Sequence, residues 1–222
     1  GDYGIFNIKT KKRETSFYES ITNIEMIAGL ERVRISSIEP NLLTDEIIDF
    51  VYHSSCFVRH FHIPLQSGSD KILRLMKRRY LRNLYFHRVE KIKELMPYCC
   101  IGVDVIVGFP GETDEDFNDT YNFLRNLNIS YLHVFSYSER DNTASLHIKN
   151  KVPKKIRALR SKILRKLSNE KKDNFYRSNL NKVRPVLFES KNYDGCIFGY
   201  TDNYVRVKTT WSKKLIDKII DC

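Results

Sequence analysis

The chain has 222 residues, enough for one large domain or a medium domain with a small appendage. Hydrophobic residues make up 41% of it, which supports a sizeable core, and no apolar run approaches the roughly 20 residues that a membrane span needs. The net charge is +11, yet residues 149–184 alone hold fourteen Lys or Arg against two acids, so the remainder sums to −1. This basic block suggests an anionic partner, nucleic acid first among the candidates, or else a solvated basic helix.

Alternating helices and strands are predicted up to residue 137. Apolar periodicity and capping residues predict helices at 17–30, 45–53, 69–77, 82–96 and after Thr113. Apolar, β-branched runs predict strands at 32–40, 57–65, 100–109 and 129–137. This alternation indicates right-handed βαβ units, hence an α/β fold with a parallel sheet or partial barrel.

The pattern changes after residue 137. A basic helix is predicted at 153–177, with an apolar stripe of Ile156, Leu159, Ile163 and Leu167. Short strands separated by Asn, Asp and Gly then predict a small β-barrel or sheet from residue 183 onward. We therefore expect a barrel part at 1–148, a basic helical linker at 149–182 and a small β domain at 183–222.

The five cysteines show no CxxC spacing, so neither a zinc site nor a disulfide framework is predicted, and a reducing, cytoplasmic setting is expected. The chain opens on GDYGIFNIKT, with no signal-peptide pattern and no Met. This start suggests a sequence that begins inside a longer protein.

Four predicted strands become polar where they end, in SSIEP (36–40), PLQSGSD (64–70), GFPGET (108–113) and SYSER (136–140). Active sites of α/β barrels lie at the carboxyl ends of the strands, so a pocket is predicted there. Gly108 would let another group approach the main chain closely. Glu39 would bind a ribose or an amine, or only cap a helix.

His60 and His62 alternate on one predicted strand and therefore share a face. Such a pair ligates metal in some barrel hydrolases, but it more often packs in the core or hydrogen-bonds a neighbour. Because no third ligand is evident, no metal site is assigned, and a metal-dependent barrel hydrolase is kept as an alternative.

Taken together, these segments resemble the methylthiotransferase family of radical S-adenosylmethionine (SAM) enzymes. GDYG at 1–4, RVRISSIEP, HIPLQSGSDKILRLMKRRY, GVDVIVGFPGETDEDF and LHVFSYSER look like successive parts of its barrel, and GYTDNYVRVK looks like its TRAM domain, a small tRNA-binding β-barrel. SSIEP, HVFSYSER and GYTDNYV are most similar to the threonylcarbamoyladenosine tRNA methylthiotransferases.

The resemblance implies 2-methylthiolation of threonylcarbamoyladenosine at position 37 of tRNA, in the anticodon stem-loop. One SAM supplies a methyl group, and another is reductively cleaved to a radical by a 4Fe-4S cluster that receives electrons from a donor. The family's CxxxCxxC motif is absent here. This chain also has Leu81 where the family usually has Thr, and SYSERDNTAS lacks the family's usual Pro and Gly residues. We therefore expect a fragment or split-gene product with a truncated TRAM domain that is inactive alone and has no assigned catalytic residue.

By the resemblance, SAM-binding positions are expected at Ser37, Glu39, Gln66, Ser67, Val107 and Gly108. Expected substrate or phosphate contacts are Arg78 and Arg140. Positions expected to follow the tRNA are Arg157, Arg160, Lys162, Arg165, Lys166, Tyr200, Tyr204 and Arg206. A third hypothesis is a non-catalytic RNA-binding protein that uses only the basic helix and the β domain.

Overall fold

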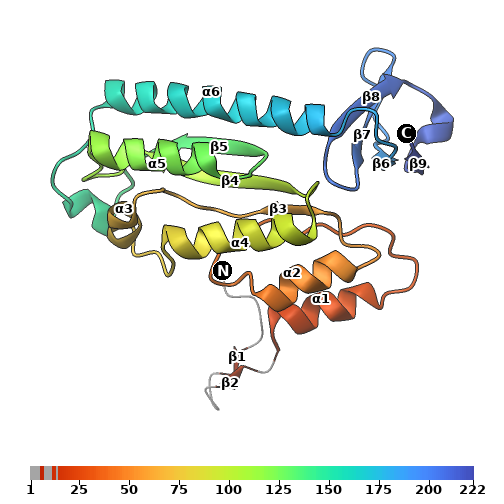
Figure 1. The fold of residues 1–222 in the computed structure, drawn as a ribbon, viewed down its shortest axis with the longest axis horizontal. Helices are drawn as coiled ribbons and strands as arrows, with labels where there is room; N and C mark the ends of the chain where they lie inside the picture. Colours follow the sequence, from red (N-terminus) through yellow and green to blue (C-terminus); the bar gives the residue numbers. More distant parts are fainter. Residues whose placement is uncertain (1–5, 8–11, 14) are drawn as a thin grey trace.

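The computed structural model describes residues 6–7, 12–13 and 15–222 (Figure 1). GDYG at 1–4 lies outside the described residues. At the amino-terminal side, β1 (Phe6–Asn7) pairs antiparallel with β2 (Lys12–Arg13). The helix α1 (Phe17–Glu25) follows, with Ser16 and Glu19 closing a capping box.

A three-stranded parallel sheet forms the centre of the fold. Its order is β3 (His60–His62), β4 (Cys100–Val107) and β5 (Tyr131–Ser136). The helix α2 (Asp45–His53) precedes β3. The helices α3 (Asp70–Leu75) and α4 (Arg82–Leu95) lie between β3 and β4, and α5 (Asp114–Asn126) lies between β4 and β5. The predicted α/β class with a parallel sheet is confirmed.

The two faces of β4 differ in what covers them. Ile101, Val103, Val105 and Val107 are buried in the main core, which also contains residues of α4, α5 and the long helix α6 (Lys154–Ser178). The alternate residues Gly102, Asp104 and Ile106 lie on the opposite face, as the two-residue period of a strand requires. This opposite face is the one that a closed barrel would turn toward its interior.

Three predicted elements are shorter in the structure. The helix predicted at 17–30 ends at Glu25, and Gly29 adopts a φ of 78° in the turn that follows. Residues 32–40 form no regular strand, because their backbone hydrogen bonds to residues 56–62 lie only near the two ends of the segment. Val33 N donates to Cys56 O, and Ile38 N donates to His62 O. The 57–65 run yields only β3 as a regular strand, although Ile63 N still donates to Gly102 O and Leu65 N to Asp104 O.

The short 3-10 helix η1 (Ala144–His147) leads into the long helix α6 (Lys154–Ser178), which Figure 1 shows running beside the sheet toward a second sheet. The predicted apolar stripe of α6 is mostly wrong. Ile156, Leu159 and Ile163 are exposed. The residues that α6 buries are Arg157, Arg160, Ser161, Leu164, Leu167, Ser168 and Phe175.

The second sheet is antiparallel, in the order β8 (Arg206–Thr210), β7 (Cys196–Thr201), β6 (Pro185–Phe188) and β9 (Ile219–Asp221), with the 3-10 helix η2 (Lys213–Leu215) before β9. Its own small core is built on Val186, Phe188 and Ile197. The strand β9 was not predicted from the sequence.

This second sheet contacts the amino-terminal ends of the parallel strands. Arg59 N donates to Asp202 O at 2.8 Å, Arg32 Nη1 to Tyr200 O at 2.8 Å, and Asn203 Nδ2 to the carbonyl oxygen of Tyr98 at 2.8 Å. The two sheets therefore meet at the end of the fold opposite the predicted pocket. Within the described part of the chain, none of the helices has the length and apolar character to cross a membrane.

Candidate functional site

A cavity of about 930 Å³ lies where β4 and β5 end. Its walls come from the end of α3 and residues 76–78, from Ile106 and Phe109, and from residues 135–148. Two of the predicted contact residues, Arg78 and Arg140, line this cavity. The predicted pocket at the carboxyl ends of the strands therefore exists.

Glu39 joins this region through an ion pair. Arg78 Nη1 donates to Glu39 Oε1 at 3.2 Å, and both side chains are partly exposed. This pairing is not predictable from local sequence, since the two residues are 39 positions apart along the chain. Ser37, two residues before Glu39, is partly buried.

Gln66, four residues after the end of β3, has an unusual backbone conformation. Its φ is 69°, in the left-handed region that non-glycine residues rarely adopt. The backbone is held there because Gln66 N donates to Asp104 O and Gln66 O accepts from Ile106 N, both at 2.9 Å. Such a conformation at a strand end is a recognised feature of ligand sites and directs attention to this side chain.

Ser67 and Gly68 serve the packing of α5 instead of facing a ligand. Ser67 is fully buried, and its hydroxyl hydrogen-bonds Thr120 Oγ1 at 3.2 Å. A Cβ on Gly68 would lie 2.7 Å from Thr120 Cα, so the glycine makes room for the helix backbone. The expected Ser67 contact with SAM therefore has no exposed group to make it.

Val107 and Gly108 also turn toward the protein. The Val107 side chain is fully buried in the main core. Gly108 has a φ of 75°, and a Cβ there would lie 2.3 Å from Arg157 Cγ. The close approach expected at Gly108 is thus made by α6 through Arg157.

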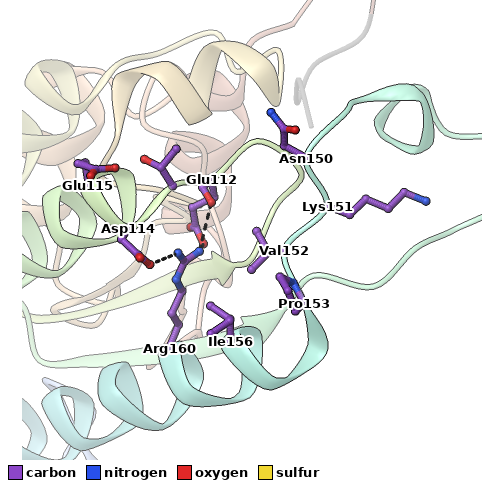
Figure 2. A pocket seen from close by; sticks show the side chains of 10 residues that line it. Glu112, Asp114, Glu115, Asn150, Lys151, Val152, Pro153, Ile156 and Arg160 are labelled. Carbon is purple, nitrogen blue, oxygen red and sulfur yellow. Dashed lines mark hydrogen bonds and ion pairs between the residues drawn. The ribbon is translucent and has the colours of Figure 1, made fainter.

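Arg157 and Arg160 fix α6 to the strand ends and are 6% and 4% exposed. Arg157 Nη2 donates to Glu139 Oε1 at 2.6 Å. Arg160 donates to Glu112 Oε2 at 2.5 Å and to Asp114 Oδ1 at 2.6 Å, as Figure 2 shows. Because both guanidinium groups are buried and paired with carboxylates, the proposed RNA-binding surface does not include them.

Glu112 links these pairs to the GFPGE turn. Its Oε2 also accepts from Gly108 N at 2.7 Å, and it lies beside Arg160 in the cleft drawn in Figure 2. Burial raises the pKa of the Glu112 carboxyl, against the lowering effects of the Gly108 hydrogen bond and the Arg160 charge. The GFPGE turn therefore acts as the anchor of α6.

The predicted RNA residues Tyr200, Tyr204 and Arg206 line one cavity of about 410 Å³ between the parallel sheet, α6 and the second sheet. The two tyrosine rings are stacked with centroids 4.6 Å apart, and the Arg34 guanidinium lies 4.8 Å from the Tyr204 centroid. Lys172 lines the same cavity. Sequence reasoning missed both cations: Arg34 lies within RVRISSIEP and contacts the Tyr204 ring, and Lys172 reaches the cavity from α6.

The other predicted RNA contacts lie along α6. Lys162, Arg165 and Lys166 are all exposed. An ion pair of 3.9 Å links Lys166 to Glu170 on the helix surface. These three cations are therefore accessible to a partner.

His60 and His62 share a face, as predicted, but have different neighbours. His60 hydrogen-bonds the Tyr131 hydroxyl at 3.1 Å and lies against Tyr204. Burial, together with a smaller effect of the Arg34 charge, lowers the pKa of His60 to about 3. His62 instead donates to Asp104 Oδ1 at 2.8 Å. The two histidines do not form a metal-binding pair, so the hydrolase alternative loses its proposed ligand set.

The cysteines do not gather into a cluster-binding site in the part of the chain that the structure describes. Cys56, Cys99 and Cys100 are buried, and burial raises the pKa of the Cys100 thiol to about 12, which disfavours the thiolate that a metal needs. The residues present therefore do not fit a 4Fe-4S cluster.

Known proteins resemble this arrangement. A family model described as the Radical SAM superfamily matches residues 7–124, just over half of the chain. The chain belongs to the radical SAM superfamily. A solved radical SAM enzyme, coproporphyrinogen III oxidase (HemN) from Escherichia coli, superimposes with a TM-score of 0.57 at 17% identity over 69% of this chain and 37% of its own.

Curated relatives of this radical SAM chain are tRNA methylthiotransferases. The threonylcarbamoyladenosine tRNA methylthiotransferase MtaB of Bacillus subtilis is 37% identical over 87% of this chain and 44% of its own length. The tRNA-2-methylthio-N(6)-dimethylallyladenosine synthase of Clostridium tetani is also 37% identical, over 96% of this chain and 48% of its own length. The chain spans about half the length of these relatives. The resemblance predicted from the motifs is confirmed.

Proposed function

We propose that this chain works as part of a cytoplasmic tRNA methylthiotransferase, supplying part of the SAM barrel and a tRNA-binding surface. The observation that carries the proposal is the similarity to relatives named for this activity over 87–96% of the chain. The reaction would be 2-methylthiolation of a modified adenosine at position 37 of tRNA, in the anticodon stem-loop.

The SAM-facing residues of this proposal are polar side chains near the carboxyl ends of the strands. Gln66, which is mostly buried, follows β3 and bridges to Val105; Arg140 lines the large cavity, and the Glu39–Arg78 pair lies at its edge. A carboxylate, an amide and guanidinium groups suit the ribose hydroxyls, amine and carboxylate of SAM. Because the cysteines do not fit a cluster, the chain alone is expected to bind SAM without cleaving it.

The RNA-facing surface combines aromatic rings with cations. Tyr200 and Tyr204 offer stacked rings near Arg206, while Lys162, Arg165 and Lys166 extend a positive line along α6. Bases stack on aromatic side chains, and cations pair with phosphates, so this combination suits RNA. The four-stranded second sheet would then be the TRAM-like element.

The threonylcarbamoyl group is the proposed mark of the substrate. The relatives above act on different modified adenosines at equal identity, so overall similarity favours neither. The proposal rests on SSIEP, HVFSYSER and GYTDNYV. Comparing binding of anticodon stem-loops that carry threonylcarbamoyladenosine or dimethylallyladenosine tests it, and tighter binding of the second would contradict it.

Salt-dependent tRNA binding tests the RNA surface. Arg165→Glu on α6 is compared with Arg125→Glu, an exposed, charge-matched control on α5. The log of the association constant should fall linearly with the log of salt concentration, and loss of the Arg165 phosphate contact should reduce that slope by about 1. Equal slopes for Arg165→Glu and the control, or no binding by the unmodified chain, would refute the surface.

A further inference from the structure

Three side chains from three neighbouring strands converge on the sheet face that a closed barrel would turn inward. They are His62 on β3, Asp104 on β4 and His133 on β5. Their convergence follows from the register, in which Gly102 lies opposite His62 and Asp104 lies opposite His133. Gly102 and Asp104 are two residues apart on β4, so they point to the same face.

The donor atoms of these side chains are close together. His62 Nε2 lies 2.8 Å and His133 Nδ1 lies 3.4 Å from the same oxygen, Asp104 Oδ1. The two imidazole rings have centroids 5.0 Å apart, and one donor atom from each of the three residues lies within 4.8 Å of the others. Among the described residues, this is the group of three or more His, Cys, Asp or Glu side chains that meets this condition.

Gly102 provides the space in which the rings lie. A Cβ at this position would be 2.4 Å from the Tyr131 hydroxyl oxygen and 2.8 Å from His62 Nδ1. The Tyr131 ring packs against both His62 and His133, with centroid distances of 6.2 and 5.2 Å, and His60 hydrogen-bonds its hydroxyl. The strands and this aromatic packing hold the cluster before any ligand arrives.

The cluster is buried on one side and open on the other. The side chains of His62, Asp104 and His133 are 10%, 23% and 55% exposed, so access increases from β3 to β5. An ion could reach the donors from this side and keep positions for water or a small ligand.

We propose that His62, Asp104 and His133 bind one divalent transition-metal ion. Two imidazole nitrogens and one carboxylate oxygen form a ligand set that Zn²⁺, Fe²⁺ and Co²⁺ accept, with further positions open to solvent. The competing explanation is that Asp104 simply hydrogen-bonds two histidines. The proposal differs from the His60/His62 pair considered from the sequence, because His60 points to Tyr131 and Tyr204.

Co²⁺ titration of the metal-free chain tests the proposal, because Co²⁺ absorption reports the ligands. The wild type should bind one equivalent, with d–d bands and without the thiolate charge-transfer band that a cysteine site would give. His133→Ala, at the most exposed ligand, should weaken binding by about a hundredfold or more, beyond the 10–100-fold typical of outer-shell changes. The control His147→Ala, at an exposed residue outside the cluster, should bind like the wild type.

Asp104→Asn provides a second variant, since it keeps the side-chain size while removing the charged ligand. Circular dichroism confirms that each variant is folded, and Zn²⁺ should raise the Tm of the wild type but not of Asp104→Asn. Absence of stoichiometric Co²⁺ binding, unchanged affinity in His133→Ala, or a thiolate band would overturn the proposal. Neither measurement uses RNA or SAM, so the result is independent of the proposed function.

Discussion

The two ends of the parallel sheet use similar residues in different ways. At the carboxyl ends, Arg157 and Arg160 are buried in ion pairs that fix α6. At the amino ends, Arg34 and Arg206 instead lie over the rings of Tyr204 and Phe198. The comparison teaches that a basic residue near a predicted site is informative only once its burial and partners are known.

The largest expected effect is on the free energy of unfolding, which should differ between loss of a buried and loss of an exposed cation on α6. Arg160→Ala leaves the buried Glu112 carboxylate without its main partner and should lower the free energy of unfolding by about 3–5 kcal/mol. Lys162→Ala, two residues away and exposed, should change it by less than about 0.5 kcal/mol. Urea unfolding measures both, and similar losses would remove the distinction between the two kinds of cation.

The buried His60 sharpens the comparison through pH. Its pKa is lowered from 6.5 to about 3, so the unfolded chain binds this proton first as the pH falls. The contribution is present above pH 6.5 and is lost progressively toward pH 3, with a slope of at most about 1.4 kcal/mol per pH unit. His60→Gln should reduce the slope of the unfolding free energy between pH 6.5 and 5.5.

The matched control for this measurement is His147→Gln, at an exposed position. Wild-type and control slopes should coincide. A wild-type slope equal to that of His60→Gln would show that His60 gains a proton in the folded state as readily as in the unfolded one.

The smallest effect concerns the aromatic pair at the amino ends. Tyr200→Ala removes one of two stacked rings and should weaken tRNA binding by about tenfold, since stacking on an aromatic side chain contributes roughly 1–3 kcal/mol per base. Tyr193→Ala, which removes an exposed ring beside the second sheet and outside this cavity, serves as the control. Fluorescence anisotropy with labelled tRNA measures both, and equal losses would argue against a specific stacking role.

Much of the fold could be predicted because local signals determined it. The continuous apolar run of β4 and the capping box of Thr113 and Asp116 each specify an element within a few residues. By contrast, β9 is three residues long and forms only through pairing with β6, a long-range contact that no local pattern encodes.

The site was less predictable, because its residues were chosen by type and motif. Lys162 and Arg160 look equivalent in the sequence, yet the buried face of α6 is set by the acidic groups Glu112 and Asp114 on another element. His133 was not predicted as a site residue, because its proximity to His62 depends on the registers of two strand pairs. Distant pairings of this kind emerge only once the chain is folded.

The length of α6 has a mechanical consequence. Its 25 helical residues span about 37 Å. Arg157 anchors its first turns, and the Asn179–Asn203 hydrogen bond anchors its end. One inserted residue would rotate the far end by about 100° and advance it by about 1.5 Å. The length of the helix therefore fixes how its two attachment points face each other. Only an insertion close to a whole number of turns would keep both sets of contacts.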